Sequence, residues 1–302
     1  MREHTLGSAY LLGFLGVASF SLTFPMTRLA VAELDPVFVG LGRAVVAAVL
    51  ALCVLGWQKA PRPSRAQVQR LIIVALGVIV GFPLLSAWAM QSVDASHGAI
   101  VAGLLPLATA AGAALRAGER PSARWWGCAI AGSALVVAHA LSAGHGQIGT
   151  ADLALVGAML SAALGYTEGA MLAREMPPAR VICWALVIAA PVLVLVLACY
   201  PVKWSAASPQ AWGAFAYVSA VSMFLGFFAW YGGLARGGIA RISQIQLLQP
   251  FLTLLAAATW FGETVAPQRW ALAAGVVVCV ALGRQAPVAT ARFALQGSTK
   301  SR

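Results

Sequence analysis

Long apolar stretches, separated by short polar connections, fill almost the whole chain. A helix that spans a bilayer needs about 20 mostly apolar residues. The pattern therefore predicts an all-α integral membrane protein with ten spanning helices, at residues 9–31, 36–57, 70–90, 96–115, 123–142, 151–173, 180–200, 211–235, 241–261 and 268–286. The remaining residues, 287–302, are polar and basic, which predicts a disordered cytoplasmic tail.

Composition strengthens the membrane interpretation. Hydrophobic residues make up 61% of the 302 residues and charged residues 10%, whereas soluble domains average about 45–50% and about 25%. The net charge of +11 does not indicate nucleic-acid binding, because the basic residues lie in short connections without interleaved aromatic residues. The five cysteines form no Cys-x-x-Cys or Cys/His cluster, so we expect no metal, no cofactor and no disulfide framework.

The placement of the basic residues predicts the orientation. If the N-terminus is inside, 16 of the 20 Lys and Arg residues fall on the inner side, and only Arg28, Lys203 and Arg269 fall outside. Cytoplasmic loops of membrane proteins carry such an excess of Lys and Arg. We therefore predict a multi-pass protein of the cell (inner) membrane with both termini in the cytoplasm.

One pattern occurs twice, 144 residues apart. An apolar helix carries a proline near its start and ends in Gly-Glu, and the next helix begins at a tryptophan. The two copies are Pro106, Gly118, Glu119 and Trp126, and Pro250, Gly262, Glu263 and Trp270. We predict two homologous repeats, 9–142 and 151–286, and five helices in each make the second repeat inverted. The prolines either kink helices beside a central cavity or only shape packing, and the Gly-Glu pairs indicate turns or caps.

Two ionisable residues lie well inside predicted helices, where a charge is costly and marks a candidate functional site. Glu168 is a candidate for proton coupling or for binding a cationic substrate group, and the alternative is a carboxyl that only packs helices. Arg43 either attracts an anionic group such as a carboxylate or, as the sequence favours, forms a structural ion pair with Glu33, Asp35 or Asp94. At 1.5 Å per residue, Arg43 and Glu168 lie roughly 10 and 25 Å below the outer surface, so we expect them not to pair.

Polar and aromatic residues within the spans are further candidates for substrate contact. Gln246 and Gln249 belong to a polar run in the ninth helix, where they either line a cavity or form hydrogen bonds between helices. Trp88, Trp230 and Tyr231 lie inside spans rather than at the interfaces where aromatic belts are expected. They either line a substrate path or belong to the core.

The repeated Pro, Gly-Glu and Trp landmarks in two five-helix halves resemble the drug/metabolite transporter superfamily, and EamA-type exporters in particular. The resemblance covers nearly all of residues 9–286. It implies ten helices, cytoplasmic termini, a central cavity between the halves, and export of small metabolites or drugs, amino acids among them. The family often places a tryptophan in the middle of the first and sixth helices, where this chain has Phe20 and Leu164. Thr23 and Tyr166 follow these positions and are candidates for substrate contact.

We therefore expect a secondary active transporter that exports an amino acid-like compound or a drug by alternating access, with the proton as the candidate coupling ion. An intramembrane enzyme is one alternative, but the chain has no GxSxG, no HExxH and no intramembrane acidic pair, so we expect no enzyme. A non-transporting receptor or a channel is the other alternative. The expected partners are a small-molecule substrate and the lipid bilayer, with the chain as a monomer or homodimer.

Overall fold

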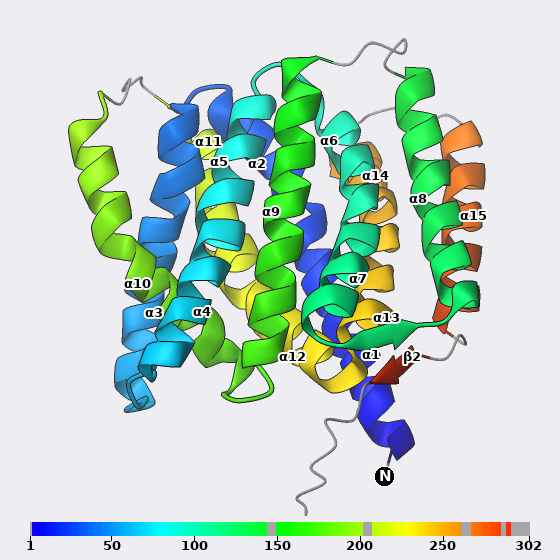
Figure 1. The fold of residues 1–302 in the computed structure, drawn as a ribbon. Helices are drawn as coiled ribbons and strands as arrows, with labels where there is room; N and C mark the ends of the chain where they lie inside the picture. The colour runs from blue at the N-terminus through cyan, green and yellow to red at the C-terminus, as the bar shows by residue number, and fades with distance from the viewer. Residues whose placement is uncertain (1, 144–148, 202–206, 261–266, 285–287, 291–302) are drawn as a thin grey trace, which may run out of the picture.

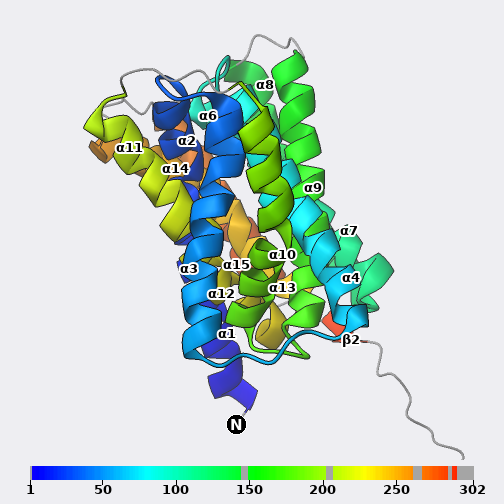
Figure 2. The same ribbon diagram turned by 90° about the vertical axis from the view of Figure 1, so that its left-hand side faces the viewer.

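The computed structural model describes all residues except 1, 144–148, 202–206, 261–266, 285–287 and 291–302. The chain forms a bundle of helices that run along a common direction (Figures 1 and 2). The helix that begins at Arg2 starts at one end of this bundle, which we call the N-terminal face, and we call the opposite end the far face.

The helices of the first half are interrupted by two π-helical segments (η1, η2) and one 3₁₀ segment (η3). Its elements are α1 Arg2–Ser21, α2 Thr23–Val31, η1 Phe38–Gly42, α3 Arg43–Trp57, α4 Arg65–Val74, η2 Ala75–Gly81, α5 Phe82–Ala89, α6 Ala95–Val101, η3 Ala102–Leu104, α7 Leu105–Arg116, β1 Glu119–Pro121 and α8 Ala123–Ala143.

The second half contains one π-helical segment (η4) and one 3₁₀ segment (η5). Its elements are α9 Thr150–Leu172, α10 Pro178–Cys199, α11 Pro209–Ala216, η4 Tyr217–Leu225, α12 Gly226–Gly237, α13 Ile239–Ser243, η5 Gln244–Leu248, α14 Gln249–Trp260, α15 Pro267–Arg284 and β2 Val288–Thr290.

Six helical stretches within the described residues are long and apolar enough to cross a membrane, which supports a multi-pass membrane protein. They are Leu6–Val31, Phe38–Trp57, Arg65–Ala89, Thr150–Leu172, Pro178–Cys199 and Pro209–Gly237. Ala102–Arg116 is a shorter apolar helix. Large apolar side chains such as Leu76 and Leu160, both 60% exposed, cover the sides of the bundle, as a protein surrounded by lipid requires.

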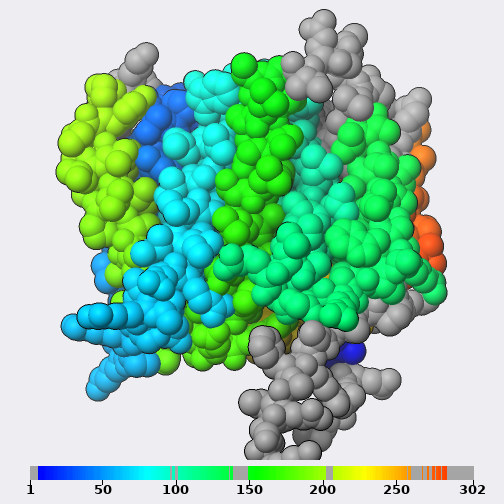
Figure 3. Space-filling model, viewed as in Figure 1, coloured from blue at the N-terminus to red at the C-terminus, as the bar shows by residue number. Residues whose placement is uncertain are grey.

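The two halves interlock. Helix α1 packs along α12 and α14 of the second half, and α9 packs along α5 and α7 of the first. Figure 3 shows α9 at the surface between residues 65–89 and residues 95–116. Helix α1 begins at the N-terminal face whereas α9 begins at the far face, so the two halves run in opposite directions (Figure 1).

The repeated prolines mark breaks in two spans. Pro106 lies in the first turn of α7 and Pro250 in the first turn of α14, and a 3₁₀ segment precedes each helix. Proline is tolerated in a first turn because its missing N–H would have no helical partner there. The sequence predicted prolines inside continuous helices, whereas the structure begins a new α-helix at each of them.

Two other boundaries differ from the sequence-based expectation. The span predicted from residue 70 begins at Arg65, because Ser64 and Gln67 form a reciprocal capping box. Strand β2 pairs antiparallel with β1. Apart from this short strand pair, the described chain is all-helical, as the sequence predicts. The disorder predicted for 287–302 does not hold for Val288–Thr290. Residues 287 and 291–302 lie outside the described part of the chain.

Candidate functional site

A small cavity lies inside the bundle between the two halves. Its volume is about 20 Å³, which is room for about one water molecule. As it stands in the structure, the cavity is too small for an organic substrate. The lining comes from both halves: Phe20, Thr23, Phe24, Arg43, Val78, Phe82, Ala102 and Leu105 from the first, and Met159, Ala162, Tyr166, Ser222, Met223, Phe227 and Gln249 from the second.

The cavity is surrounded by the points where the spans depart from α-helical geometry. Such π-helical turns occur frequently at functional sites, and 3₁₀ stretches within helices often mark hinges. Each of the five η segments either contributes a lining residue or directly precedes one: Arg43 follows η1, Val78 lies in η2, Ala102 in η3, Ser222 and Met223 in η4, and Gln249 follows η5. Leu105 and Gln249 directly precede the repeated prolines, so both proline breaks lie beside the cavity.

Arg43 is the charged residue of the cavity wall. It is 1% exposed, and its Nε and Nη1 groups have no hydrogen-bond partner in the described structure. Its guanidinium carbon lies 5.9 Å from the centre of the Phe82 ring. An arginine in the middle of a spanning helix costs about 2.5–3.5 kcal/mol on insertion scales, and a desolvated cation–π contact offsets about 2 kcal/mol of it. Arg43 is therefore incompletely compensated in this structure.

The ion pair that the sequence favoured for Arg43 is wrong, because its three proposed partners bind elsewhere. Glu33 accepts hydrogen bonds from the Ser208 backbone and hydroxyl. Asp35 accepts from two backbone N–H groups at the start of the second span. Asp94 pairs with Arg28 at 2.8 Å.

Hydroxyl and amide groups complete the polar part of the wall. The hydroxyls of Thr23 and Ser222 lie 2.7 Å apart and join the two halves. The Gln249 amide donates to the Phe20 carbonyl oxygen at 3.4 Å. These groups are neutral, so within the described lining only Arg43 carries a charge.

Aromatic rings form the apolar part of the wall. The rings of Phe20 and Phe227 are 5.1 Å apart, and Tyr166 lies 5.9 Å from Phe227. Trp230 packs behind them at 5.4 Å from Tyr166 and 6.1 Å from Phe20. The cluster therefore forms an apolar wall in the same cavity that Arg43 lines.

The structure brings together four of the residues predicted to contact substrate, since Thr23, Arg43, Tyr166 and Gln249 all line the cavity. The other predicted residues lie elsewhere. Gln246 is buried beside Tyr166, but both polar atoms of its amide lack a hydrogen bond of good geometry. The Tyr231 hydroxyl donates to the Gly165 carbonyl oxygen at 3.1 Å.

Two further predicted residues do not line the cavity. Trp230 lies behind the wall, and Trp88 is 47% exposed on the side of the bundle. Leu164, the counterpart of Phe20, is 42% exposed. Sequence reasoning missed Ser222 and Phe82, which lie in apolar spans and carry no motif; the only available signal was a hydroxyl or an aromatic ring within a span.

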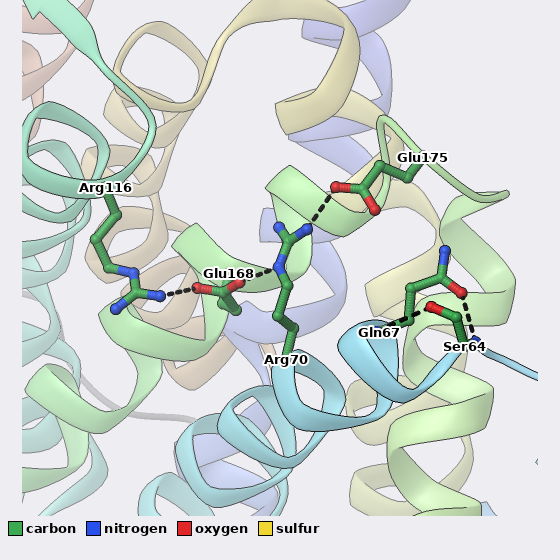
Figure 4. A network of polar contacts seen from close by, with 6 residues as sticks. All are labelled: Ser64, Gln67, Arg70, Arg116, Glu168 and Glu175. Carbon is green, nitrogen blue, oxygen red and sulfur yellow. Dashed lines mark hydrogen bonds and ion pairs between the residues drawn. The ribbon is translucent and has the colours of Figure 1, made fainter.

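Glu168 lies at the N-terminal face rather than in the cavity wall. Its side chain is 1% exposed and forms ion pairs with Arg70 and, at 2.9 Å, with Arg116 (Figure 4). Arg70 also pairs with Glu175. The arginines belong to the first half and the carboxylates to the second, so this network joins the halves below the cavity. As the difference in depth predicted, Glu168 does not pair with Arg43.

Glu119 forms a second link between the halves at the same face. It is 1% exposed and accepts hydrogen bonds from the backbone N–H groups of Ile239 and Ala240 at 2.9 and 2.8 Å. Arg174 pairs with it at 2.8 Å. Glu119 thus caps the start of α13, where backbone donors have no helical partner. Gly118 precedes it at φ 65, a conformation that favours glycine. The twin pair Gly262-Glu263 lies outside the described residues.

We expect Glu119→Ala to lower the free energy of unfolding by about 3 kcal/mol or more, because two backbone hydrogen bonds are lost and hydrogen bonds to a charged acceptor contribute about 1.5–3 kcal/mol each. Glu119→Gln should cost less, since its amide oxygen still accepts from the backbone. Unfolding in mixed detergent micelles measures both. Glu175→Ala is the matched control, because that side chain is 47% exposed and should change stability little. Equal effects of Glu119→Ala and Glu175→Ala would contradict the capping role.

Contacts also join the halves at the far face. His97 of α6 pairs with Asp152 of α9, and Glu33 joins Ser208 at the start of α11. The hydrogen bonds from the Ser208 backbone and hydroxyl lower the pKa of Glu33. A lowered carboxyl pKa means that this contact is present at neutral pH and is lost as the pH falls through that pKa. Polar contacts therefore join the two halves at both faces of the bundle.

Comparison with known proteins gives matches along the whole bundle. The chain matches the EamA-like transporter family at residues 7–138 and again at 149–283. It is 45% identical over 278 residues to the uncharacterized transporter YdeK of Bacillus subtilis (strain 168), covering 90% of this chain and 96% of that protein. It is 24% identical over 258 residues to a probable terminal-alkyne amino-acid exporter of Streptantibioticus cattleyicolor, covering 84% and 85%.

A solved crystal structure of another protein has the same fold. It aligns with a TM-score of 0.73 and covers 92% of this chain and 98% of its own, at 18% identity. The two family matches cover the two halves that run in opposite directions in Figure 1.

Proposed function

The chain belongs to the EamA-like transporter family, and from this membership we propose that it is a secondary active transporter that exports a small metabolite, an amino acid-like compound or a drug, across the inner membrane. The proposed architecture is ten spanning helices in two inverted repeats, 9–142 and 151–286. The N-terminal face is the cytoplasmic face, because the basic connections at residues 59–70, 116–124 and 174–180 lie there.

The observation that carries this proposal is the small cavity at the junction of the two halves. Both halves line it, and ion pairs join the halves at both faces of the bundle. Alternating access needs a central site and two closures that open in turn, and inverted repeats supply two related closures. The exporter from Streptantibioticus cattleyicolor, named for an amino acid, supports an amino acid-like substrate.

The proton is the proposed coupling ion. Glu168 is a buried carboxylate that holds two arginines of the opposite half. A proton on Glu168 would remove the charge that attracts Arg70 and Arg116, and would weaken the closure of the N-terminal face. Coupling would then act through this closure, at a distance from the substrate.

Counterflow in proteoliposomes tests the function. We expect the purified chain to exchange at least one labelled compound from a panel of amino acids, amines and drugs, and to accumulate it when a pH gradient is imposed. Glu168→Gln should remove the effect of the gradient while the protein is still produced and folded. Asp94→Asn is the matched control, because Asp94 is 74% exposed. If folded protein moves none of these compounds, the transport proposal fails.

A further inference from the structure

Arg43 has no counter-ion among the described side chains. The chain has nine carboxylate side chains, and the two outside the described side chains are Glu3 and Glu263. The other seven are engaged with other residues: Glu33 with Ser208, Asp35 with backbone N–H groups, Asp94 with Arg28, Glu119 with Arg174, Asp152 with His97, Glu168 with Arg70 and Arg116, and Glu175 with Arg70. A buried cation with unpaired N–H groups therefore faces the cavity.

The shape of a guanidinium group matches that of a carboxylate. Its planar N–H groups can donate two parallel hydrogen bonds to the two oxygens of a carboxylate. The Nε and Nη1 groups of Arg43 lack partners, and each forms one edge of this planar fork together with Nη2, so a carboxylate can bind along either edge. The ring of Phe82 contacts the guanidinium and leaves these in-plane donors available.

The rest of the wall shows which other groups the ligand carries. The rings of Phe20, Tyr166 and Phe227 offer an apolar surface, which suits a hydrocarbon or aromatic body. The described lining contains no acidic side chain. An ammonium group would therefore meet only ring faces and neutral oxygens, and it has no counter-charge in this wall.

We propose that the cavity binds a small organic carboxylate with an apolar body, that Arg43 is the anchor of its carboxylate, and that the ligand needs no amino group. This inference rests on the proposed transport function, because it names the substrate class of the same cavity. This ligand class excludes zwitterions whose ammonium group also needs a counter-charge, and it excludes cationic drugs. An inorganic anion such as chloride would pair with Arg43 but would leave the aromatic wall without a partner.

Equilibrium binding to the purified full chain tests the ligand class without requiring transport. The probes are 3-phenylpropanoate, phenylalanine and phenethylamine, which share one ring and differ in their charged groups. We expect 3-phenylpropanoate to bind at least as tightly as phenylalanine, and phenethylamine to bind at least about tenfold more weakly, because the amine leaves the arginine unpaired. Tighter binding of the amine, or full competition by chloride at equal concentration, would overturn the proposal.

Variants test the anchor itself. Arg43→Gln should weaken binding of both carboxylates by at least about tenfold, and Arg43→Lys should retain part of it. Arg28→Gln, which removes one positive charge at the far face, should leave binding unchanged. The thermal midpoint of Arg43→Gln should be unchanged or raised, because the substitution removes an uncompensated charge, whereas loss of a structural ion pair would lower it. Wild-type-like binding in Arg43→Gln would overturn the anchor.

Transport and binding can fail separately. Selective binding of carboxylates without counterflow would leave the site standing and remove the transport function. Counterflow of amines with no carboxylate binding would leave a transporter and overturn the inference.

Discussion

Replacing Arg70 and Arg116 together by glutamine should lower the free energy of unfolding by about 3–5 kcal/mol, because it leaves a buried carboxylate without its cations. Glu168 is the buried member of the network, with a side chain that is 1% exposed, whereas the side chains of Arg70 and Arg116 are 23% and 48% exposed. Figure 4 shows Glu168 between the two arginines. Glutamine at both positions cannot supply a compensating charge.

Because Glu168 is buried and its two arginines are partly exposed, removing the carboxylate instead of the arginines should have a small effect. Glu168→Gln removes the buried charge and leaves two arginines that reach solvent, so it should cost only about 1 kcal/mol. Adding Glu168→Gln to the double arginine variant should therefore restore most of the lost stability. Unfolding of all these variants in mixed detergent micelles measures the effects. If Glu168→Gln alone lowers the free energy of unfolding as much as the double arginine variant does, the burial of an unpaired Glu168 charge is not what destabilises the double variant.

The partners of Glu168 show what the sequence could not predict. Hydropathy placed Arg70 at the first residue of a span, but the Ser64 cap starts the helix at Arg65. Arg70 is therefore about 7.5 Å further along the helix than a start at residue 70 implies. A pair between Glu168 and Arg43 could be excluded correctly, since their depths follow from the rise per residue alone. The identity of the real partners depends on how helices of different halves pack.

The cavity could be predicted only in part for a similar reason. The polar residues Thr23, Arg43 and Gln249 stand out within apolar spans, and the repeat pointed to a junction between halves. The direction in which a side chain points depends on the π-helical and 3₁₀ turns, which shift the helical phase and have no clear sequence signal. Trp88 follows such a segment in its span, and the structure places it on the side of the bundle.

Substituting Gly77 should have the largest effect of any single change considered in the spans. A Cβ atom at Gly77 would lie 2.5 Å from the Ser161 carbonyl oxygen and 2.8 Å from the Gly165 backbone nitrogen. These are backbone atoms of α9, so no side chain can rotate away, and the helices must separate. We expect Gly77→Val to lower the free energy of unfolding by about 3 kcal/mol.

Transport should fall as well, by more than about tenfold, because Gly77 precedes Val78 in the cavity wall and contacts the opposite half. Unfolding in micelles and counterflow in proteoliposomes measure the two effects. Gly56→Ala is the control for glycine in a spanning helix, since a Cβ atom added at Gly56 would meet nothing within 4 Å; alanine there should be neutral or stabilising by up to about 1 kcal/mol. Gly77→Ala should lie between the two, because one methyl group already meets the α9 backbone. If Gly77→Ala behaves like Gly56→Ala, the halves are not held at backbone contact beside the cavity.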